Sequence, residues 1–417
     1  MYDFANSGYT TVVITAVFNA YFVSAVAANQ PWATFAWAAT LALSYVAIIA
    51  TAPLVGAYAD LRAAKKRLLA ASTAGCVVFT AALALVGPGN VALAVSLVAL
   101  SNFFFGTGEN LAAAFLPELA KGSALGRVSG WGWSLGYVGG LATLALCLAY
   151  VERAQALGEP AASFVPVTML ITAAMFALAS LPTFLLLRER ATPQQGAAAA
   201  RALRGAYARV AYTIAHAAKY RDLGRFLLCL VFYQAGVQAV IAIAAVYAQQ
   251  AMGFSARDSI VLILAVNVTA AIGALLFGQV QDRLGHVPTI ALTLLGWIAT
   301  VFLAWFAESR ALFWLAANCA GLCLGSSQSA GRALVGYLTP PDRHAEFFGL
   351  WGLAVKLSSI LGPITYGLAT WVSQGNHRLA MLVTGSYFLV GLALLAGIDA
   401  ERGRAAAMSA DGPDSRA

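Results

Sequence analysis

Twelve runs of mostly apolar residues, each about 20 residues long, follow one another along this chain with short polar breaks between them. A helix of that length crosses the hydrocarbon core of a bilayer. Backbone groups in hydrocarbon must pair within their own segment, and the runs lack the alternation of a membrane β-barrel. The sequence therefore predicts an all-α, polytopic membrane protein with twelve transmembrane helices. The expected spans are residues 8–28, 34–58, 67–87, 91–116, 129–150, 165–187, 224–249, 258–280, 288–307, 311–336, 346–371 and 378–398.

The distribution of positive charge predicts how these spans are oriented. With the N-terminus placed in the cytoplasm, 19 of the 25 Lys and Arg residues fall on the cytoplasmic side and four on the other. Such an excess is typical of cytoplasmic loops. Topology and attraction to anionic lipid headgroups account for the net charge of +8. We expect cytoplasmic termini, the lipid bilayer as a partner and no nucleic-acid partner.

The composition argues against an enzyme. Hydrophobic residues make up 61% of the chain and charged residues 10%, against about a quarter charged in soluble domains. No metalloprotease, nucleophile-elbow or phosphate-loop motif is found. The five cysteines lie inside apolar runs, where they act as small hydrophobic residues, so neither a disulfide nor a metal site is expected. They are Cys76, Cys147, Cys229, Cys319 and Cys323.

One long polar break divides the spans into six and six. We expect an N-terminal bundle at residues 1–188, a cytoplasmic linker at 189–223, a C-terminal bundle at 224–398 and a disordered cytoplasmic tail at 399–417. The linker either forms a helix on the membrane surface or is a solvated connector.

A repeated loop pattern indicates that the two halves are related. Gly56 is followed four residues later by Asp60, with Arg62 beyond it, and Gly278 is followed by Asp282 and Arg283. An acid at a helix end can accept hydrogen bonds from the free N–H groups that begin another helix. Our hypothesis is a gate in which Asp60 holds the start of span 346–371 and Asp282 holds the start of span 129–150. The alternative is that they are ordinary loop residues that set topology.

These loops resemble the signature loop of the major facilitator superfamily, G-x-x-x-D-R-x-G-R-R/K, with Leu61 in place of the first Arg. A closer resemblance is to the branch of fungal vacuolar (autophagy-related) amino-acid effluxers. It rests on YDFANS at residues 2–7, GEN at 108–110, SGWG at 129–132 and EFFG at 346–349. The resemblance implies two six-helix bundles that give alternating access to a central site. Ala235 stands where an acid is common in this family.

Three charged residues lie at least one helical turn inside the ends of predicted spans, where a charge costs roughly 2.5 to 3.5 kcal/mol. They are Glu109, Arg332 and Lys356. Each either belongs to a structural ion pair or lines a cavity and meets a solute or a coupling proton. Arg332 is close enough to a helix end to reach the headgroups instead.

Uncharged polar side chains gather at similar depth. Gln234 and Gln238 are four residues apart and so share a helix face. Each is predicted to contact solute, or else to join helices by hydrogen bonds. The full set is Asn19, Asn102, Gln234, Gln238, Asn267 and Gln328.

Together these features predict a monomeric secondary transporter in the inner (plasma) membrane of a bacterium. It would move a small polar or zwitterionic solute, such as an amino acid, with export the expected direction by analogy with the family. No cofactor is expected, and an ion or proton gradient would supply the energy. The alternatives are a membrane sensor or scaffold on a transporter fold, and a lipid or drug exporter.

Overall fold

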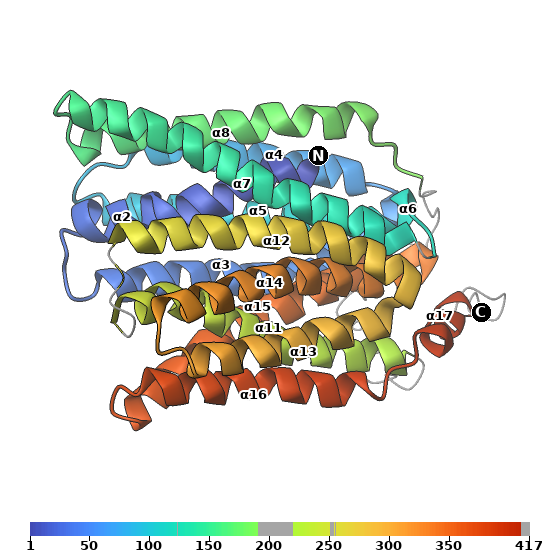
Figure 1. Ribbon diagram of the computed structural model, residues 1–417. Coiled ribbons are helices and arrows are strands. Elements are labelled where there is room, and N and C mark those ends of the chain that lie inside the picture. Colours follow the sequence, from blue (N-terminus) through green and yellow to red (C-terminus); the bar gives the residue numbers. More distant parts are fainter. Residues whose placement is uncertain (123, 191–219, 251–253, 255, 410–417) are drawn as a thin grey trace. The chain divides into compact units, whose positions relative to one another are not determined.

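The computed structural model describes residues 1–122, 124–190, 220–250, 254 and 256–409. All regular elements in these residues are helices (Figure 1), which confirms the all-α prediction. The two alternatives for the linker, a surface helix or a solvated connector, fall mainly on residues 191–219 and lie outside the described part.

Each expected span corresponds to a helix whose ends lie within about six residues of the prediction. The first is a broken helix made of α1 (Tyr2–Tyr9), η1 (Thr10–Ala16), α2 (Phe18–Tyr21) and η2 (Phe22–Val26). It starts six residues before the expected residue 8, because Tyr2, Ala5 and Asn6 are already buried. The following helices are α3 (Ala33–Arg62), α4 (Lys65–Ala82) with η3 (Leu83–Leu85), α5 (Val91–Ala113), α6 (Leu116–Leu119), α7 (Ala124–Ala156) and α8 (Ala161–Leu186).

The second half of the sequence repeats this pattern, and its first span is one unbroken helix. These are α11 (Arg221–Gln250), α12 (Ala256–Leu284), α13 (His286–Trp305), α14 (Arg310–Leu338), η4 (Pro341–Arg343), α15 (His344–Val372) and α16 (His377–Leu395). A last helix, α17 (Ala400–Ser409), follows them.

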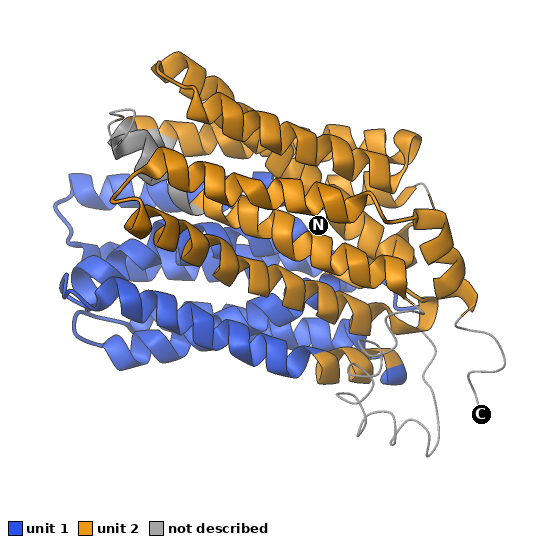
Figure 2. Ribbon diagram, turned by 90° about the horizontal axis from the view of Figure 1, so that it is seen from below, with its two compact units in different colours: residues 1–52, 61–112, 135–193 blue, residues 53–60, 113–134, 194–417 orange. Residues whose placement is uncertain are grey.

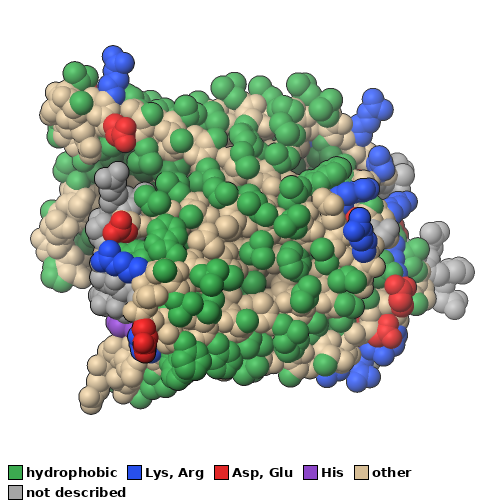
Figure 3. Space-filling model, viewed as in Figure 1, with side chains coloured by type: hydrophobic (Ala, Val, Ile, Leu, Met, Phe, Trp, Pro, Cys, Tyr) green, Lys and Arg blue, Asp and Glu red, His purple; other side chains and the backbone are tan. Residues whose placement is uncertain are grey.

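The described residues contain eleven helices that are long and apolar enough to cross a membrane. The twelfth expected span, α14, has 29 residues but is more polar than the others. Its polar side chains are mostly buried, so the interior of the protein surrounds them. Figure 3 shows hydrophobic side chains over the face in view and charged side chains mostly near the helix ends. The chain is an integral multi-pass membrane protein.

The helices form two compact units that do not follow the two expected bundles at every point (Figure 2). Unit 1 comprises residues 1–52, 61–112 and 135–193, and unit 2 comprises 53–60, 113–134 and 194–417. Unit 2 therefore takes in two short segments from the first half of the sequence, the end of α3 and the stretch from α6 into α7.

Each unit is held together by close helix packing. In unit 1, α8 lies along α1 and α4, and the Tyr9 hydroxyl is 2.8 Å from the Ser101 hydroxyl. In unit 2, α14 packs along α12 and α13, and α11 packs along α15 and α16. Gly362 lets the backbone of α15 approach Ala235 of α11 at the place where the sequence has Gly-Pro.

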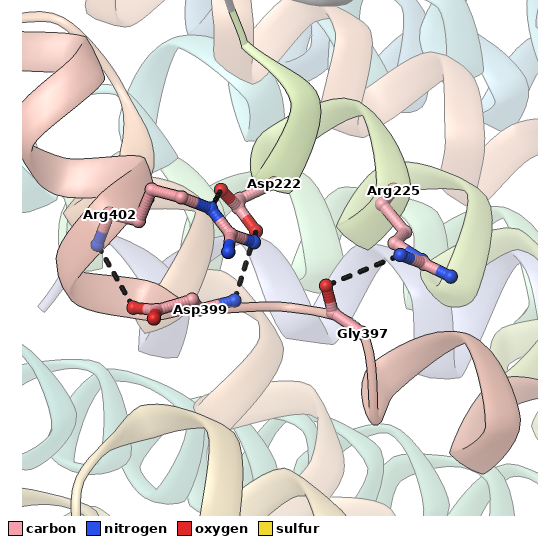
Figure 4. A network of polar contacts seen from close by, with 5 residues as sticks. All are labelled: Asp222, Arg225, Gly397, Asp399 and Arg402. Carbon is pink, nitrogen blue, oxygen red and sulfur yellow. Dashed lines mark hydrogen bonds and ion pairs between the residues drawn. The ribbon is translucent and has the colours of Figure 1, made fainter.

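The structure differs from the expected disordered tail over residues 400–409, which form α17. This helix is held in place by Asp222 at the start of α11, which binds both the backbone and a side chain of the tail (Figure 4). Its carboxylate accepts from Asp399 N at 2.9 Å and from Arg402 Nε at 2.9 Å and Nη2 at 2.5 Å. Arg225 donates to the Gly397 carbonyl at 3.3 Å. Residues 410–417 lie outside the described part.

Candidate functional site

Asp60 caps the first turn of α15. Its Oδ1 accepts from Ala345 N at 3.1 Å, and its Oδ2 accepts from Glu346 N at 3.0 Å. These N–H groups have no partner within their own helix, and the helix N-terminus favours a negative charge. A Cβ on Gly56 would lie 2.7 Å from the Ala345 carbonyl oxygen, so glycine permits this approach.

Asp282 makes the equivalent contact with α7. Its Oδ1 accepts from Arg127 N at 3.2 Å in the first turn of that helix. A Cβ on Gly278 would lie 2.7 Å from the Gly126 carbonyl oxygen. Each aspartate thus ends the second span of one sequence half and caps the fifth span of the other. Both contacts are those predicted from the sequence, while their gating role stays a prediction.

Arg332 lies against the beginning of α7, within the same unit. It is buried, and its Nε donates to Ser129 Oγ at 3.1 Å while its Nη2 donates to the Ser129 carbonyl at 3.0 Å. The guanidinium carbon is 5.4 Å from the centroid of the Trp133 ring. Ser129 Oγ in turn donates to the Ser329 carbonyl of α14 at 2.8 Å. In this arrangement Arg332 joins α7 to α14 and does not extend to the headgroups.

The polar candidates of the second half are brought together in part. Gln234 Nε2 donates to Gln328 Oε1 at 2.7 Å, and Gln328 Nε2 donates back to Gln234 Oε1 at 3.3 Å. Gln328 and Gln238 are half-buried, whereas Gln234 and Lys356 are buried. The amide pair joins α11 to α14, which supports a packing role for Gln234 and leaves Gln328 partly accessible.

The candidates of the first half lie in unit 1. Asn102 is buried and donates to Ser44 Oγ at 2.5 Å, which joins α5 to α3. Asn19 is half-buried on the short α2, between two π-helical stretches of a kind that often mark functional sites. Glu109 is half-buried on α5. Its predicted pairing with Lys356 or Arg332 stays a prediction, because those residues belong to unit 2.

Three further candidates make few contacts with other helices. Asn267 donates to the Ile263 carbonyl of its own helix at 2.8 Å. The gate candidates Arg62 and Arg283 are exposed at the ends of α3 and α12. Neither arginine therefore forms part of the buried caps.

Sequence reasoning missed a third carboxylate cap. Glu189, placed in the expected linker, accepts from Lys65 N at 2.8 Å and from Lys66 N at 3.1 Å at the start of α4. Lys66 Nζ also donates to the Leu187 carbonyl at 2.6 Å. The available signal was an acid just after a span, as at Asp60 and Asp282. Ser129 gave no such signal, because a serine in an apolar helix has many structural uses.

The fold is that of major facilitator superfamily transporters. The human organic anion transporter MFSD10 (TETRAN) has a TM-score of 0.72 to this chain at 14% identity, covering 94% of this chain and 97% of that one. The E. coli fucose:proton symporter FucP has a TM-score of 0.71 at 15% identity, covering 95% of each chain.

Within that class, the chain belongs to the family described as vacuole effluxer Atg22 like, whose model matches residues 20–126 and 123–408. It is 26% identical over 410 residues to the MFS-type transporter YxiO of Bacillus subtilis (strain 168), covering 96% of this chain and 94% of that one. It is 26% identical over 296 residues to autophagy-related protein 22 of Cryptococcus neoformans var. neoformans, covering 67% of this chain and 53% of that protein. The chain is therefore an MFS-type transporter and not an enzyme.

Proposed function

We propose that this protein is a secondary transporter that moves a small polar or zwitterionic solute by alternating access. The observation that carries the proposal is the pair of aspartate caps in unit 2. Asp60 and Asp282 occupy equivalent loop positions, and each holds the first turn of a helix from the other sequence half. Exchange between two access states needs contacts between halves that form and break, and backbone hydrogen bonds at helix ends are suited to this.

The Asp60 and Asp282 caps form in the access state in which the protein is closed at the end where the two aspartates lie. By the positive-inside rule that end faces the cytoplasm, as do both termini. Opening there separates the end of α3 from α15 and the end of α12 from α7. Closure is favoured by charge-assisted hydrogen bonds and by the close approach at Gly56 and Gly278.

The solute proposed is zwitterionic, and an amino acid is the simplest case. Opposite charges lie inside expected spans of each unit, Glu109 in unit 1 and Lys356 in unit 2. Each unit also has half-buried polar side chains, Asn19 in unit 1 and Gln238 and Gln328 in unit 2. Export is the proposed direction because the family is described as an effluxer. An ion or proton gradient would drive it, with the monomer as the working unit in a bacterial inner membrane.

The decisive experiment compares Asp60→Asn with wild type in proteoliposomes, using a panel of amino acids at several pH gradients. The change removes the negative charge and replaces one acceptor oxygen by an amide NH2, so one of the two backbone N–H groups loses its partner, at a cost of about 1–3 kcal/mol. A cost of one or two kcal/mol changes the ratio of closed to open molecules by roughly 5- to 30-fold, so flux should fall. Asp342→Asn is the matched control, because Asp342 is exposed in η4 beside the same helix.

Other outcomes identify the alternatives. Undiminished flux in a correctly inserted Asp60→Asn variant rules out the gate. Binding of solute without flux by the wild type indicates a sensor or scaffold. Flux of apolar probes in preference to amino acids indicates a lipid or drug exporter.

A further inference from the structure

The first three turns of α7 contact two helices of unit 2 through different faces. Gly126 and Gly130 face α12, where a Cβ on Gly126 would lie 2.7 Å from Asp282 Oδ1 and a Cβ on Gly130 would meet the Ala274 carbonyl. Ser129 and Trp133 face Arg332 of α14. The contact with α12 is made largely by backbone and small residues, whereas the contact with α14 includes the charged Arg332 side chain, the Ser129–Ser329 hydrogen bond and apolar packing of Leu125 on Ala333.

The atoms that Arg332 uses are informative. Nε and Nη2 form one edge of the guanidinium, and the two parallel N–H bonds of such an edge match the two oxygens of a carboxylate. Here they donate to Ser129 Oγ and to the Ser129 carbonyl oxygen, at 3.1 and 3.0 Å. A single serine thus places two oxygens where a carboxylate would place its own pair. The Trp133 ring lies beside the guanidinium and helps to fix its plane.

Arg332 is also next to the polar candidates for solute contact. Gln328 precedes it by four residues, so the two side chains lie on one face of α14, about 5–6 Å apart at Cβ. Gln328 is partly accessible and exchanges hydrogen bonds with Gln234 of α11. A solute held by Gln328 therefore lies within reach of the Arg332 edge.

We propose that Arg332 exchanges Ser129 for the carboxylate of the transported solute. This inference rests on the proposed function and deepens it, because it ties gate opening to recognition of one chemical group. With α7 on α14, Ser129 occupies the guanidinium edge. When α7 moves away, the edge turns to the solute carboxylate, so solute binding and opening of the α7–α14 contact favour each other.

The test measures affinity in the purified full-length protein by calorimetry. The probes are the standard L-amino acids, L-lactate and the carboxamides of the amino acids that bind. Wild type should prefer the acid to its carboxamide. Ser129→Ala removes one competing acceptor and should tighten acid binding several-fold, with no change for the carboxamide. Arg332→Lys keeps the charge but loses the fork, and should reduce the acid preference about tenfold.

Arg225→Lys is the matched control. Arg225 lies at the start of α11 and donates to the Gly397 carbonyl, so its replacement by lysine should not change the acid preference. If Arg332→Lys does not fold, Ser129→Ala alone decides. The inference is overturned if no acid in the panel binds, if wild type binds acid and carboxamide equally, or if Ser129→Ala leaves acid affinity unchanged or lowers it. If flux falls in Asp60→Asn but wild type shows no preference for the acid over its carboxamide, this inference fails while the proposed function remains supported.

Discussion

Gly56 is the residue at which a single methyl group should matter most. Its Cβ would lie 2.7 Å from the Ala345 carbonyl oxygen and 2.8 Å from Glu346 Cα, and both are backbone atoms. Overpacking of this kind costs about 1–3 kcal/mol, so Gly56→Ala should disfavour the capped state and reduce flux. Proteoliposome transport and thermal unfolding measure the effect.

Gly367→Ala provides the control for this change. It lies on α15, and a Cβ there would meet nothing within 4 Å. The better helix propensity of alanine should leave stability equal or slightly higher. If both alanine variants transport alike, the close approach at Gly56 has no role in the cycle.

The Gln234 and Gln328 amides allow a test of packing against solute contact. Gln328→Leu leaves the buried Gln234 amide without its partner, which should cost about 1–3 kcal/mol of stability. The double variant Gln234→Leu/Gln328→Leu removes both partners and should recover most of that loss. Thermal unfolding reports stability, and solute affinity is measured in parallel. Stability recovered together with normal affinity would argue against Gln328 as a solute contact.

Among the helices, α17 shows how a polar tail becomes ordered. The hydrogen bond to Asp222 raises the pKa of the Arg402 guanidinium above its ordinary value, which is already high enough to keep this side chain charged. Tyr337 donates to Glu401 at 2.9 Å, and Arg404 donates to the Tyr337 carbonyl at 3.0 Å near the end of α14. These contacts fasten α17 to the ends of α11 and α14.

We therefore expect Arg402→Ala to release α17. Amide hydrogen exchange of residues 400–409 should become faster, while exchange in the middle of α11 stays unchanged. Ser409→Ala is the control, since its hydroxyl donates only within α17, to the Ala406 carbonyl. Equal exchange in Arg402→Ala and wild type would show that the Asp222 contact does not hold the helix.

The sequence predicts helices well and contacts between them unevenly. Runs of apolar residues located all twelve spans, because hydrocarbon demands a helix of nearly fixed length. The caps at Asp60 and Asp282 were predictable, since a repeated Gly and Asp pattern marks them twice. The contacts of Ser129, Asp222 and Glu189 were not predicted, because they join elements far apart in sequence and their residue types have other common uses.

For the molecule as a whole, the distribution of Lys and Arg predicts which side of the membrane the termini face. The fold alone does not determine this orientation. With 19 of 25 basic residues on one side, we expect both termini in the cytoplasm. A protease applied to spheroplasts, whose outer membrane is opened, should leave N- and C-terminal epitope tags uncut, and lysis should expose both. Cleavage of either tag in intact spheroplasts would contradict the orientation and the assignment of the caps to the cytoplasmic side.

The caps have a consequence for how this chain can vary. Asp60 and Asp282 recognise peptide N–H groups, which every residue except proline provides. The two carboxylates are therefore demanding positions, whereas Ala345, Glu346 and Arg127 contribute to the caps through their backbone N–H groups, which do not depend on the side chain. Relatives that keep this mechanism should tolerate many residue types at these donor positions and reject proline there.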